Sequence, residues 1–313
     1  MTLIVFAAGL SSCRNEQQVA FTDNEPLVIE LDGKGLTILQ LTDLHLTYGI
    51  DYNDRRTYKA VETLVESADF DLVVFTGDIV MSPFAVPLFA RLVSVMDKTG
   101  VPWTFVLGNH DTDYHDPFRL VSVAQRADNL FFKAGPQLED GGVGNFKITF
   151  TLEDVPFYHA YFFDTKSERE PYTEEEGKYD HLSEAQVAWY ENFVSEDTVP
   201  SIAFMHTPLR QFLLIETLDD DAYEGRFGEP VHPQGVDTGF FDVALAIGMT
   251  RGVFVGHDHE NDFAFEHEGM LLAYGRLSGY NGYGSPAIGG RVIHIDENGV
   301  LSTWVITEDE VGE

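Results

Sequence analysis

Val106-Leu107-Gly108-Asn109-His110-Asp111 is the stretch that decides how the whole chain is interpreted. An apolar run, residues 103–107, is typical of a buried strand, and it ends in a glycine followed by an amide, an imidazole and a carboxylate. Alone, such a cluster at a strand end is most often a turn with a hydrogen-bonded Asn or Asp. Four other places in the chain repeat the arrangement, which makes a shared metal site the better interpretation.

At each of these places an apolar strand runs directly into side chains that bind metal ions. The five sets are Asp43 and His45, Asp78, Asn109 and His110, His206, and His257 and His259. In α/β sheets, ligands gather outside the carboxyl ends of the strands, so the sets meet if their strands are neighbours. Alternate residues of an extended segment point the same way, so both donors of Asp-x-His and of His-x-His can face one site.

The donor types predict two metal ions. Nitrogen and oxygen donors of this kind suit Mn, Fe, Zn or Ni better than Ca. Eight such residues exceed what one ion with about four to six ligands uses, and an aspartate is the natural bridge between two ions. The alternative for any single histidine is a hydrogen-bonded core residue. Six histidines without a partner motif are interpreted in that way: His115, His159, His181, His232, His267 and His294.

The composition describes a folded chain of catalytic size with an acidic surface. Its 313 residues are 44% hydrophobic and 13% aromatic, which is enough to bury a large core. Lys and Arg together number 19 against 52 Asp and Glu, so the formal net charge is -33. A field of this sign repels nucleic acids and anionic membranes unless a local cation reverses it.

The first residues are expected to lie outside the folded domain. The apolar run in residues 1–12 is shorter than the roughly 20 residues of a membrane-spanning helix, and Leu10-Ser11-Ser12-Cys13 resembles the lipobox of bacterial lipoproteins. This resemblance implies a lipoprotein signal peptide over 1–12, membrane attachment through a lipidated Cys13, and a cell-surface or periplasmic location. Residues 13–26 would form a polar tether and 27–313 the domain. The alternative is a cytoplasmic protein whose single cysteine is incidental.

The pattern within residues 27–313 alternates strands and helices without an internal repeat. Apolar segments at 27–31 and 36–41, joined by a glycine-rich turn, predict a hairpin. Ser82 and Pro83 predict the N-cap and first-turn proline of a helix that reaches residue 96. Ser183 and Gln186 form a capping-box pattern. The adjacent segments 146–151 and 157–163 predict an antiparallel pair.

In their order along the chain, the five sets resemble the motifs of the calcineurin-like metallophosphoesterase family. The motifs are Asp43-x-His45, Gly77-Asp78, Gly108-Asn109-His110-Asp111, His206 and Gly256-His257-x-His259. The resemblance covers about residues 36–300. It implies an α/β fold, a four-layer αββα sandwich with two mixed β-sheets.

Further segments are similar to the purple-acid-phosphatase-like subgroup known from plants and fungi. These segments are residues 142–146, 161–164, 256–263 and 274–280. Residue 81 is Met, where the purple enzymes place the tyrosine ligand that gives their colour. A coloured ferric site is therefore not expected.

The family resemblance also implies a role for each residue of the site. The first metal would be held by Asp43, His45 and His259. The second would be held by Asn109, His206 and His257. Asp78 would bridge the two ions. His110 would stay free of metal near the leaving group, with Asp111 as its orienting partner.

The implied activity is hydrolysis of small phosphoesters by water activated between two divalent or trivalent ions, Mn, Fe or Zn, with phosphomonoesters favoured. The ions would attract phosphate on an otherwise repulsive body, whereas long nucleic acids would still be repelled. Asn109, Arg276, Tyr280 and Tyr283 are candidates for substrate contacts. A phosphodiesterase or nuclease with the same site is one alternative. A surface protein that binds a phosphorylated ligand without turnover is another, and no protein partner is inferred.

Overall fold

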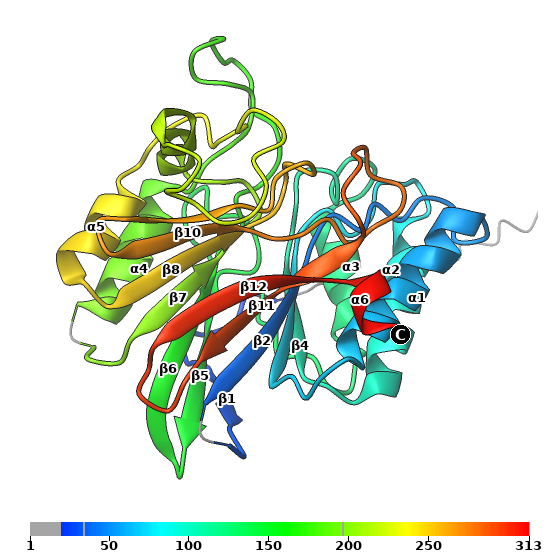
Figure 1. Cartoon of the computed structure of the whole chain (residues 1–313), viewed down its shortest axis with the longest axis horizontal. Helices are drawn as coiled ribbons and strands as arrows, with labels where there is room; N and C mark the ends of the chain where they lie inside the picture. The colour runs from blue at the N-terminus through cyan, green and yellow to red at the C-terminus, as the bar shows by residue number, and fades with distance from the viewer. Residues whose placement is uncertain (1–19, 34, 196, 313) are drawn as a thin grey trace, which may run out of the picture.

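Two β-sheets pack face to face, and helices cover the outer side of each sheet (Figure 1). The computed structural model describes residues 20–33, 35–195 and 197–312. The lipobox-like segment at Cys13 lies outside these described residues. None of the helices within the described ranges has the length and apolar character needed to cross a membrane.

The five-stranded sheet carries the first three ligand sets. Its strand order is β12-β11-β2-β3-β4, in which the three last strands are parallel and the other two pairings are antiparallel. Its strands are β2 (Leu36–Leu41), β3 (Leu72–Thr76), β4 (Trp103–Val106), β11 (Gly289–Ile295) and β12 (Leu301–Thr307). Because β2, β3 and β4 are parallel neighbours, their carboxyl ends lie at one edge of the sheet.

The seven-stranded sheet carries the last two ligand sets. Its order is β1-β5-β6-β7-β8-β10-β9, with both parallel and antiparallel pairs. Its strands are β1 (Leu27–Glu30), β5 (Phe146–Leu152), β6 (Val155–Phe162), β7 (Ser201–Phe204), β8 (Thr250–Val255), β9 (Ala264–His267) and β10 (Met270–Tyr274). β7 precedes His206 and β8 precedes His257, and these two strands are parallel neighbours.

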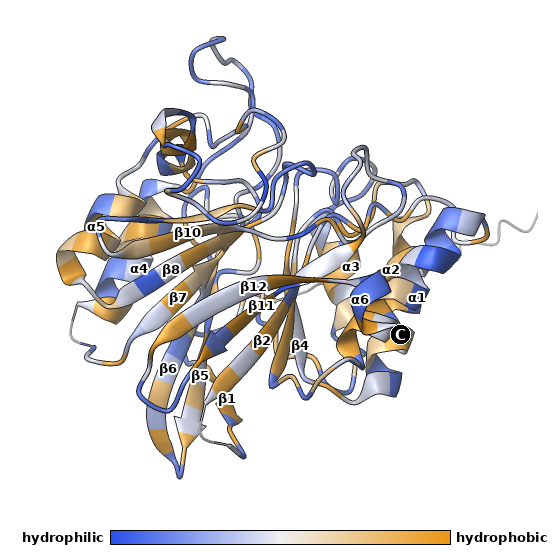
Figure 2. Cartoon of the chain, viewed as in Figure 1, coloured by the Kyte–Doolittle hydropathy of each residue, from blue (hydrophilic) through white to orange (hydrophobic). Residues whose placement is uncertain are grey.

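Three apolar layers separate the four layers of secondary structure. One layer lies between the two sheets, and one lies under the helices of each half. The five-stranded half is covered by α1 (Tyr52–Val65), α2 (Ala85–Thr99), α3 (Pro117–Ala124) and the short α6 (Glu308–Val311); the other half is covered by α4 (Glu184–Val194), α5 (Phe240–Ile247) and the 3₁₀ helix η1 (Arg210–Thr217). Figure 2 shows hydrophobic residues concentrated along the strands. The predicted four-layer αββα sandwich with two mixed sheets is confirmed.

The predicted hairpin of β1 and β2 is wrong. β1 pairs with β5 of the seven-stranded sheet, whereas β2 pairs with β3 and β11 of the other sheet. Ile29 of β1 and Ile38 of β2 both point into the apolar layer between the sheets. The two strands therefore bury their apolar sides in the same inter-sheet layer, instead of exchanging hydrogen bonds side by side.

The predicted start of the second helix is also wrong, while other local signals hold. Ser82 donates its hydroxyl to the carbonyl oxygen of Thr47 and accepts a hydrogen bond from the amide of Phe84, so it closes a turn, and α2 begins at Ala85. The capping box of Ser183 and Gln186 is present at the start of α4. The antiparallel pairing of β5 with β6 is confirmed as well.

Candidate metal centre

The five ligand sets meet where the carboxyl ends of strands from both sheets come together. Within each sheet the backbone joins neighbouring strand ends, since the Asp43 amide donates to the Gly77 carbonyl at 3.1 Å and the Gly256 amide donates to the His206 carbonyl at 3.0 Å. The seven predicted ligands are all buried: Asp43, His45, Asp78, Asn109, His206, His257 and His259. The sequence predicted that these ligands meet only if their strands are neighbours. In the structure they do meet.

Glycine is required where these strand ends approach one another. A Cβ at Gly256 would lie 2.1 Å from Thr42 Oγ1 and 3.0 Å from the Asp43 carboxylate. A Cβ at Gly108 would lie 2.2 Å from both the amide nitrogen and Oδ1 of Asp78. The glycines next to the ligands therefore allow the loops to approach closely, which no other residue would permit without displacing a ligand.

Four of the ligands have a backbone conformation that is unusual for residues other than glycine. The φ angles are 56° at Asp43, 45° at His45, 50° at Asp78 and 87° at His257. Such positive angles cost free energy and persist where the surrounding structure imposes them, most often at functional sites. The backbone is therefore held in a form that aims these side chains at a common point.

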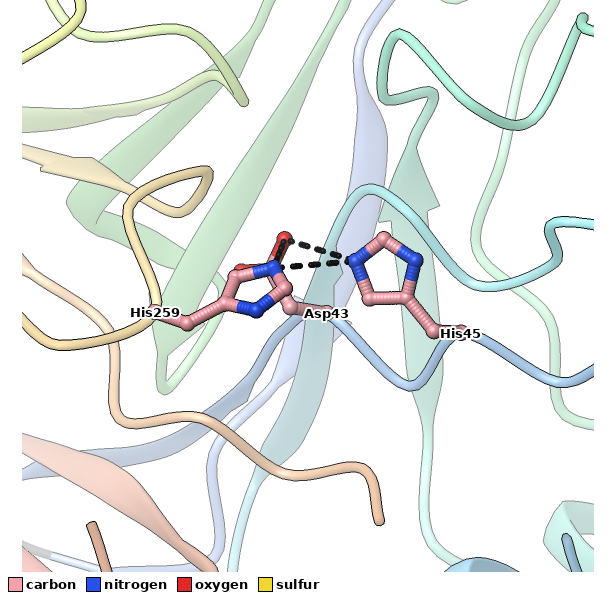
Figure 3. Close-up of side chains that lie close together, drawn as sticks. All are labelled: Asp43, His45 and His259. Atoms are coloured by element: carbon pink, nitrogen blue, oxygen red, sulfur yellow. Dashed lines mark hydrogen bonds and ion pairs between the residues drawn. The ribbon is translucent and has the colours of Figure 1, made fainter. Parts of the chain in front are cut away.

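Asp43, His45 and His259 form the first group of metal-type donors (Figure 3). The Nε2 atoms of the two histidines lie 3.0 Å apart. Asp43 Oδ1 lies 3.7 Å from Nε2 of His45 and 3.5 Å from Nε2 of His259. The aspartate and His45 come from the end of β2, and His259 follows β8, so the two sheets build this group together.

Asp78, His206 and His257 form the second group. Nε2 of His206 lies 3.2 Å from Nδ1 of His257 and 3.1 Å from Oδ1 of Asn109. Asn109 therefore adds an amide oxygen to the group.

Asp78 lies between the two groups. Its Oδ2 is 3.6 Å from Nε2 of His45 in the first group and 3.4 Å from Nε2 of His206 in the second. Its Oδ1 accepts a hydrogen bond from the amide of His110 at 2.8 Å. A single carboxylate oxygen thus faces donors of both groups, which fits a ligand that two ions would share.

Hydrogen bonds to the backbone fix which nitrogen two of the histidines present. Nδ1 of His206 is 2.7 Å from the Thr76 carbonyl oxygen, and Nδ1 of His259 is 3.0 Å from that of Tyr283. A carbonyl oxygen can only accept, so each Nδ1 carries a hydrogen and each Nε2 faces the site. Such outer partners commonly set the tautomer of a metal-binding histidine.

Without a cation, the site would need protons on histidines to offset two buried carboxylates. Burial alone would raise the pKa values of Asp43 and Asp78, but the nearby histidines outweigh it and lower both. Burial opposes charge on His206, yet Asp78 and Asp43 raise its pKa to about 10. Burial lowers the pKa of His257 to about 4. The centre is therefore built for positive charge.

The donor set fits a pair of metal ions. Two ligands about 2.1 Å from one ion, at angles of about 90° to 109°, lie about 3.0 to 3.4 Å apart. The separations within both groups lie in or just above that range. Among the described residues, Oδ1 of Asp43 is buried without a hydrogen-bond partner. A buried carboxylate oxygen without a donor is costly, and a cation between these donors would satisfy it.

The prediction that Asp111 orients His110 is wrong. Asp111 is buried and accepts hydrogen bonds from the amides of Gly108 and Val80, both at 2.8 Å, so it holds the loop in place. Burial and the nearby charge of Asp78 raise its pKa to about 7. The carboxylate that holds His110 belongs to Asp113, whose Oδ2 lies 2.8 Å from Nδ1 of the ring.

The three candidates for substrate contact in the glycine-rich stretch lie in different surroundings. Arg276 is paired with Asp262 and with the Ala287 carbonyl, and Tyr280 donates its hydroxyl to Glu308. Neither residue lines the cavity at the metal centre. Tyr283 does line it and stacks on the His259 ring at 4.1 Å between centroids.

The cavity at the metal centre also contains residues that the sequence did not single out. It has a volume of about 170 Å³, and its walls include His45, Asp78, His110, Tyr179, His232 and Asn281. Tyr179 contacts the edge of the His257 ring, with centroids 4.2 Å apart. Asn281 donates to Asp54 at 2.6 Å. No spacing pattern in the sequence marks Tyr179 or Asn281 as part of the site.

Comparisons with known proteins agree with this geometry. Residues 36–261 match the family described as calcineurin-like phosphoesterase. The chain is 26% identical over 331 residues to a protein of Arabidopsis thaliana named probable inactive purple acid phosphatase 28, covering 91% of this chain and 82% of the relative. It is 27% identical over 305 residues to the plant's probable inactive purple acid phosphatase 14, covering 83% and 74%. A solved dimetal phosphatase from Danio rerio shares the fold, with a TM-score of 0.54 and 13% identity over 87% of this chain and 99% of that one.

Proposed function

The chain belongs to the calcineurin-like phosphoesterase family, and on this premise we propose that it hydrolyses small phosphomonoesters with two metal ions bound. The observation that carries the proposal is the position of Asp78, whose Oδ2 lies within 3.6 Å of a histidine of each donor group. Such a carboxylate would join two ions into one centre. When bound, the ions would supply Lewis acidity and a nucleophilic water at neutral pH.

His110 is the residue proposed to assist the leaving group. It lines the cavity and its ring lies 5.5 Å from that of His45, between centroids. Nδ1 is occupied by Asp113, so Nε2 is the nitrogen available to a bound substrate. A proton held there could pass to the departing alkoxide, as in general acid catalysis.

The size and charge of the surroundings support a small substrate. A cavity of about 170 Å³ suits a phosphoryl group with little of the attached alcohol. The formal charge of -33 opposes the approach of long polyanions, while the metal pair would attract phosphate locally. Small phosphoesters are therefore favoured over nucleic acids.

Two of the relatives carry the word inactive in their names, so binding without turnover is the alternative to test. Every donor that a dinuclear site needs is present in this chain, which supports turnover. Metal-loaded protein should hydrolyse 4-nitrophenyl phosphate faster than bis(4-nitrophenyl) phosphate or a cyclic nucleotide. A preference for diesters would overturn the monoesterase assignment, and no turnover of any phosphoester would support the binding alternative.

Mn, Fe or Zn is the proposed metal, because each group contains two histidine nitrogens beside its oxygen donors. Met81 lines the cavity, so its position offers no phenolate oxygen. Elemental analysis of purified protein would identify the ions. Calcium or magnesium as the bound metal would contradict the proposal.

A further inference from the structure

We propose that three exposed aromatic side chains, Tyr48, Phe84 and Tyr114, bind the leaving group of the substrate and make the site selective for phosphomonoesters of aromatic alcohols. These three residues are called the aromatic rim below. The inference rests on the proposed function and names the substrate class of the same site. None of the three residues belongs to a ligand motif.

Exposed apolar side chains are concentrated around the metal centre. Tyr48 is 66% exposed, Phe84 54% and Tyr114 56%. Of the large apolar side chains exposed in residues 20–33, 35–195 and 197–312, more than half lie either shortly after a ligand motif or in the cavity wall: Tyr48, Ile50, Tyr52, Phe84, Tyr114 and Tyr283. A single exposed ring is ordinary, whereas several beside one cavity are typical of a binding surface.

Hydrogen bonds hold the segment of Tyr48 beside the cavity. Asn281 of the cavity wall donates to one carboxylate oxygen of Asp54 at 2.6 Å, and the other oxygen accepts from the Tyr48 amide at 2.7 Å. The carbonyl oxygen of Thr47 accepts from the hydroxyl of Ser82. The segment that carries Tyr48 is therefore bonded both to the cavity wall and to the segment that leads to Phe84.

Phe84 and Tyr114 lie on neighbouring segments. Tyr114 follows His110, a residue of the cavity wall, by four positions. Nε2 of His115 lies 2.8 Å from the carbonyl oxygen of Pro83, so the residues next to Tyr114 and Phe84 are in contact. The three segments that carry the aromatic rim thus lie side by side, and all three belong to the five-stranded half of the fold.

The leaving group of a bound substrate would lie on the side of the aromatic rim. A cavity of about 170 Å³ holds a phosphoryl group with little of the attached alcohol. The leaving oxygen would approach His110, from which it would take a proton, and the side chain of His110 is 36% exposed. The rest of the alcohol therefore extends outward past His110, towards the segments that carry the rim.

Aromatic rings favour an aromatic partner over a polar one. Rings pack against one another in offset or edge-to-face arrangements, which adds to the gain from burying apolar surface. A neutral ring also avoids the repulsion that the formal charge of -33 exerts on an anionic alcohol group. The rim therefore selects aryl esters over esters of glycerol or of sugars.

Calorimetric titration of metal-loaded protein with two phosphonates tests the rim without turnover. Benzylphosphonate and methylphosphonate share the anionic group and differ in the ring. The wild-type protein should bind benzylphosphonate about tenfold more tightly. The triple variant Tyr48→Ser, Phe84→Ser, Tyr114→Ser should lose most of this difference and keep its affinity for methylphosphonate. Trp304→Ser is the matched control, because Trp304 is an exposed aromatic residue of β12 that does not line the cavity.

Two results of this titration would refute the rim: equal affinity of the wild-type protein for both phosphonates, or an undiminished difference in the triple variant. If the triple variant does not fold, the three single variants decide, since at least one of them should reduce the difference about threefold. If neither phosphonate binds to the wild-type protein, the phosphoryl site itself is absent, and the proposed function fails together with this inference.

Kinetics provide the second readout. In the triple variant, kcat/KM for 1-naphthyl phosphate should fall about tenfold, whereas kcat/KM for glycerol 3-phosphate should change less than about twofold. Equal losses on both esters would contradict selection by the rim. If the wild-type protein binds the phosphonates but hydrolyses no ester, the proposed function fails, and the titration alone decides whether the rim binds the ring.

Discussion

Asp78 shows how one residue joins two sites. Its two carboxylate oxygens have separate tasks, because Oδ2 faces donors of both groups and Oδ1 accepts from the His110 amide. Its backbone is held at a φ of 50°. Removing its charge would therefore affect both ions and the loop that carries His110.

Asp78→Asn should lose most of its bound metal and at least about a hundredfold of its activity, since an amide bridges two cations far less well than a carboxylate. Elemental analysis and turnover of 4-nitrophenyl phosphate would measure both losses. The variant keeps the shape of the side chain, so circular dichroism should remain that of the wild type. Near-normal turnover would contradict the bridging role.

His110→Ala should retain both metals and lose kcat, most strongly for substrates with poor leaving groups such as phenyl phosphate, because it removes a proton donor and no metal ligand. Asp113→Asn should lower the same rate by a smaller factor, about tenfold, by weakening the hydrogen bond that holds the ring. Steady-state kinetics of each variant with phenyl phosphate and with 4-nitrophenyl phosphate would measure this dependence on the leaving group. Equal losses of kcat on both esters would speak against leaving-group assistance.

At the residue scale, the sequence predicts the metal donors and misses their partners. The donors were found because each follows an apolar strand, a pattern visible in the chain. Asp111 was misassigned because its role was carried over from the family resemblance, whereas its side chain turns inward to the Gly108 and Val80 amides. His232 reaches the cavity through Asp258, a contact between loops that no local pattern encodes.

At the element scale, the close approach of strand ends decides whether the centre forms. Gly256 directly follows β8 and lies against Thr42 and Asp43, which follow β2 of the other sheet. The two halves thus touch at the ligands themselves. A side chain at this position would push the fifth motif away from the first.

Gly256→Ala should therefore reduce metal binding and destabilise the fold by about 1 to 3 kcal/mol, the usual range for overpacking a tight contact. Gly33→Ala is the matched control, because a Cβ there meets nothing within 4 Å. Chemical denaturation and elemental analysis of both variants provide the comparison. Wild-type stability and metal content in Gly256→Ala would show that the loops do not require this contact.

Local signals predicted elements well where their cause is local. The capping box at Ser183 depends on two residues of one turn, and it is present. The prediction of a hairpin of β1 and β2 was wrong because a short connection permits two strands to pair but does not require it. Both strands instead bury apolar side chains between the sheets. Ser82 does not cap the helix because its hydroxyl donates a hydrogen bond to the carbonyl oxygen of Thr47, a residue distant in the sequence.

At the scale of the whole molecule, the resemblance of the motifs predicted the four-layer architecture, while composition predicted only a large core. Strand order between the sheets depends on contacts between residues far apart in the chain, such as β1 with β5. The hydrophobic pattern of each strand shows that it is buried but does not identify its neighbour. The family motifs supplied this missing information.

The stability of the whole chain should fall between about pH 6.5 and pH 4 through His159. Burial lowers the pKa of this β6 residue to about 4, helped by Lys147 and opposed by Asp197, which lies 2.9 Å from Nε2. Between these pH values the unfolded chain binds a proton that the folded chain does not, so stability decreases as the pH falls, by up to about 3 kcal/mol.

Urea denaturation of metal-free protein at pH 7 and pH 5 would measure this effect. His159→Gln should lose part of the pH dependence, because glutamine does not titrate in this window. His294→Gln should keep the wild-type dependence. If the free energy of unfolding changed equally between pH 7 and pH 5 in all three proteins, His159 would be excluded as a source of the pH dependence.

The most direct test of two ions acting in one hydrolytic centre is turnover of 4-nitrophenyl phosphate during titration of metal-free protein with Mn, Fe or Zn. Because Asp78 faces both donor groups, activity should rise until two equivalents per chain have been added and then stay constant. Full activity at one equivalent, or no turnover at two with any of the three metals, would contradict the account.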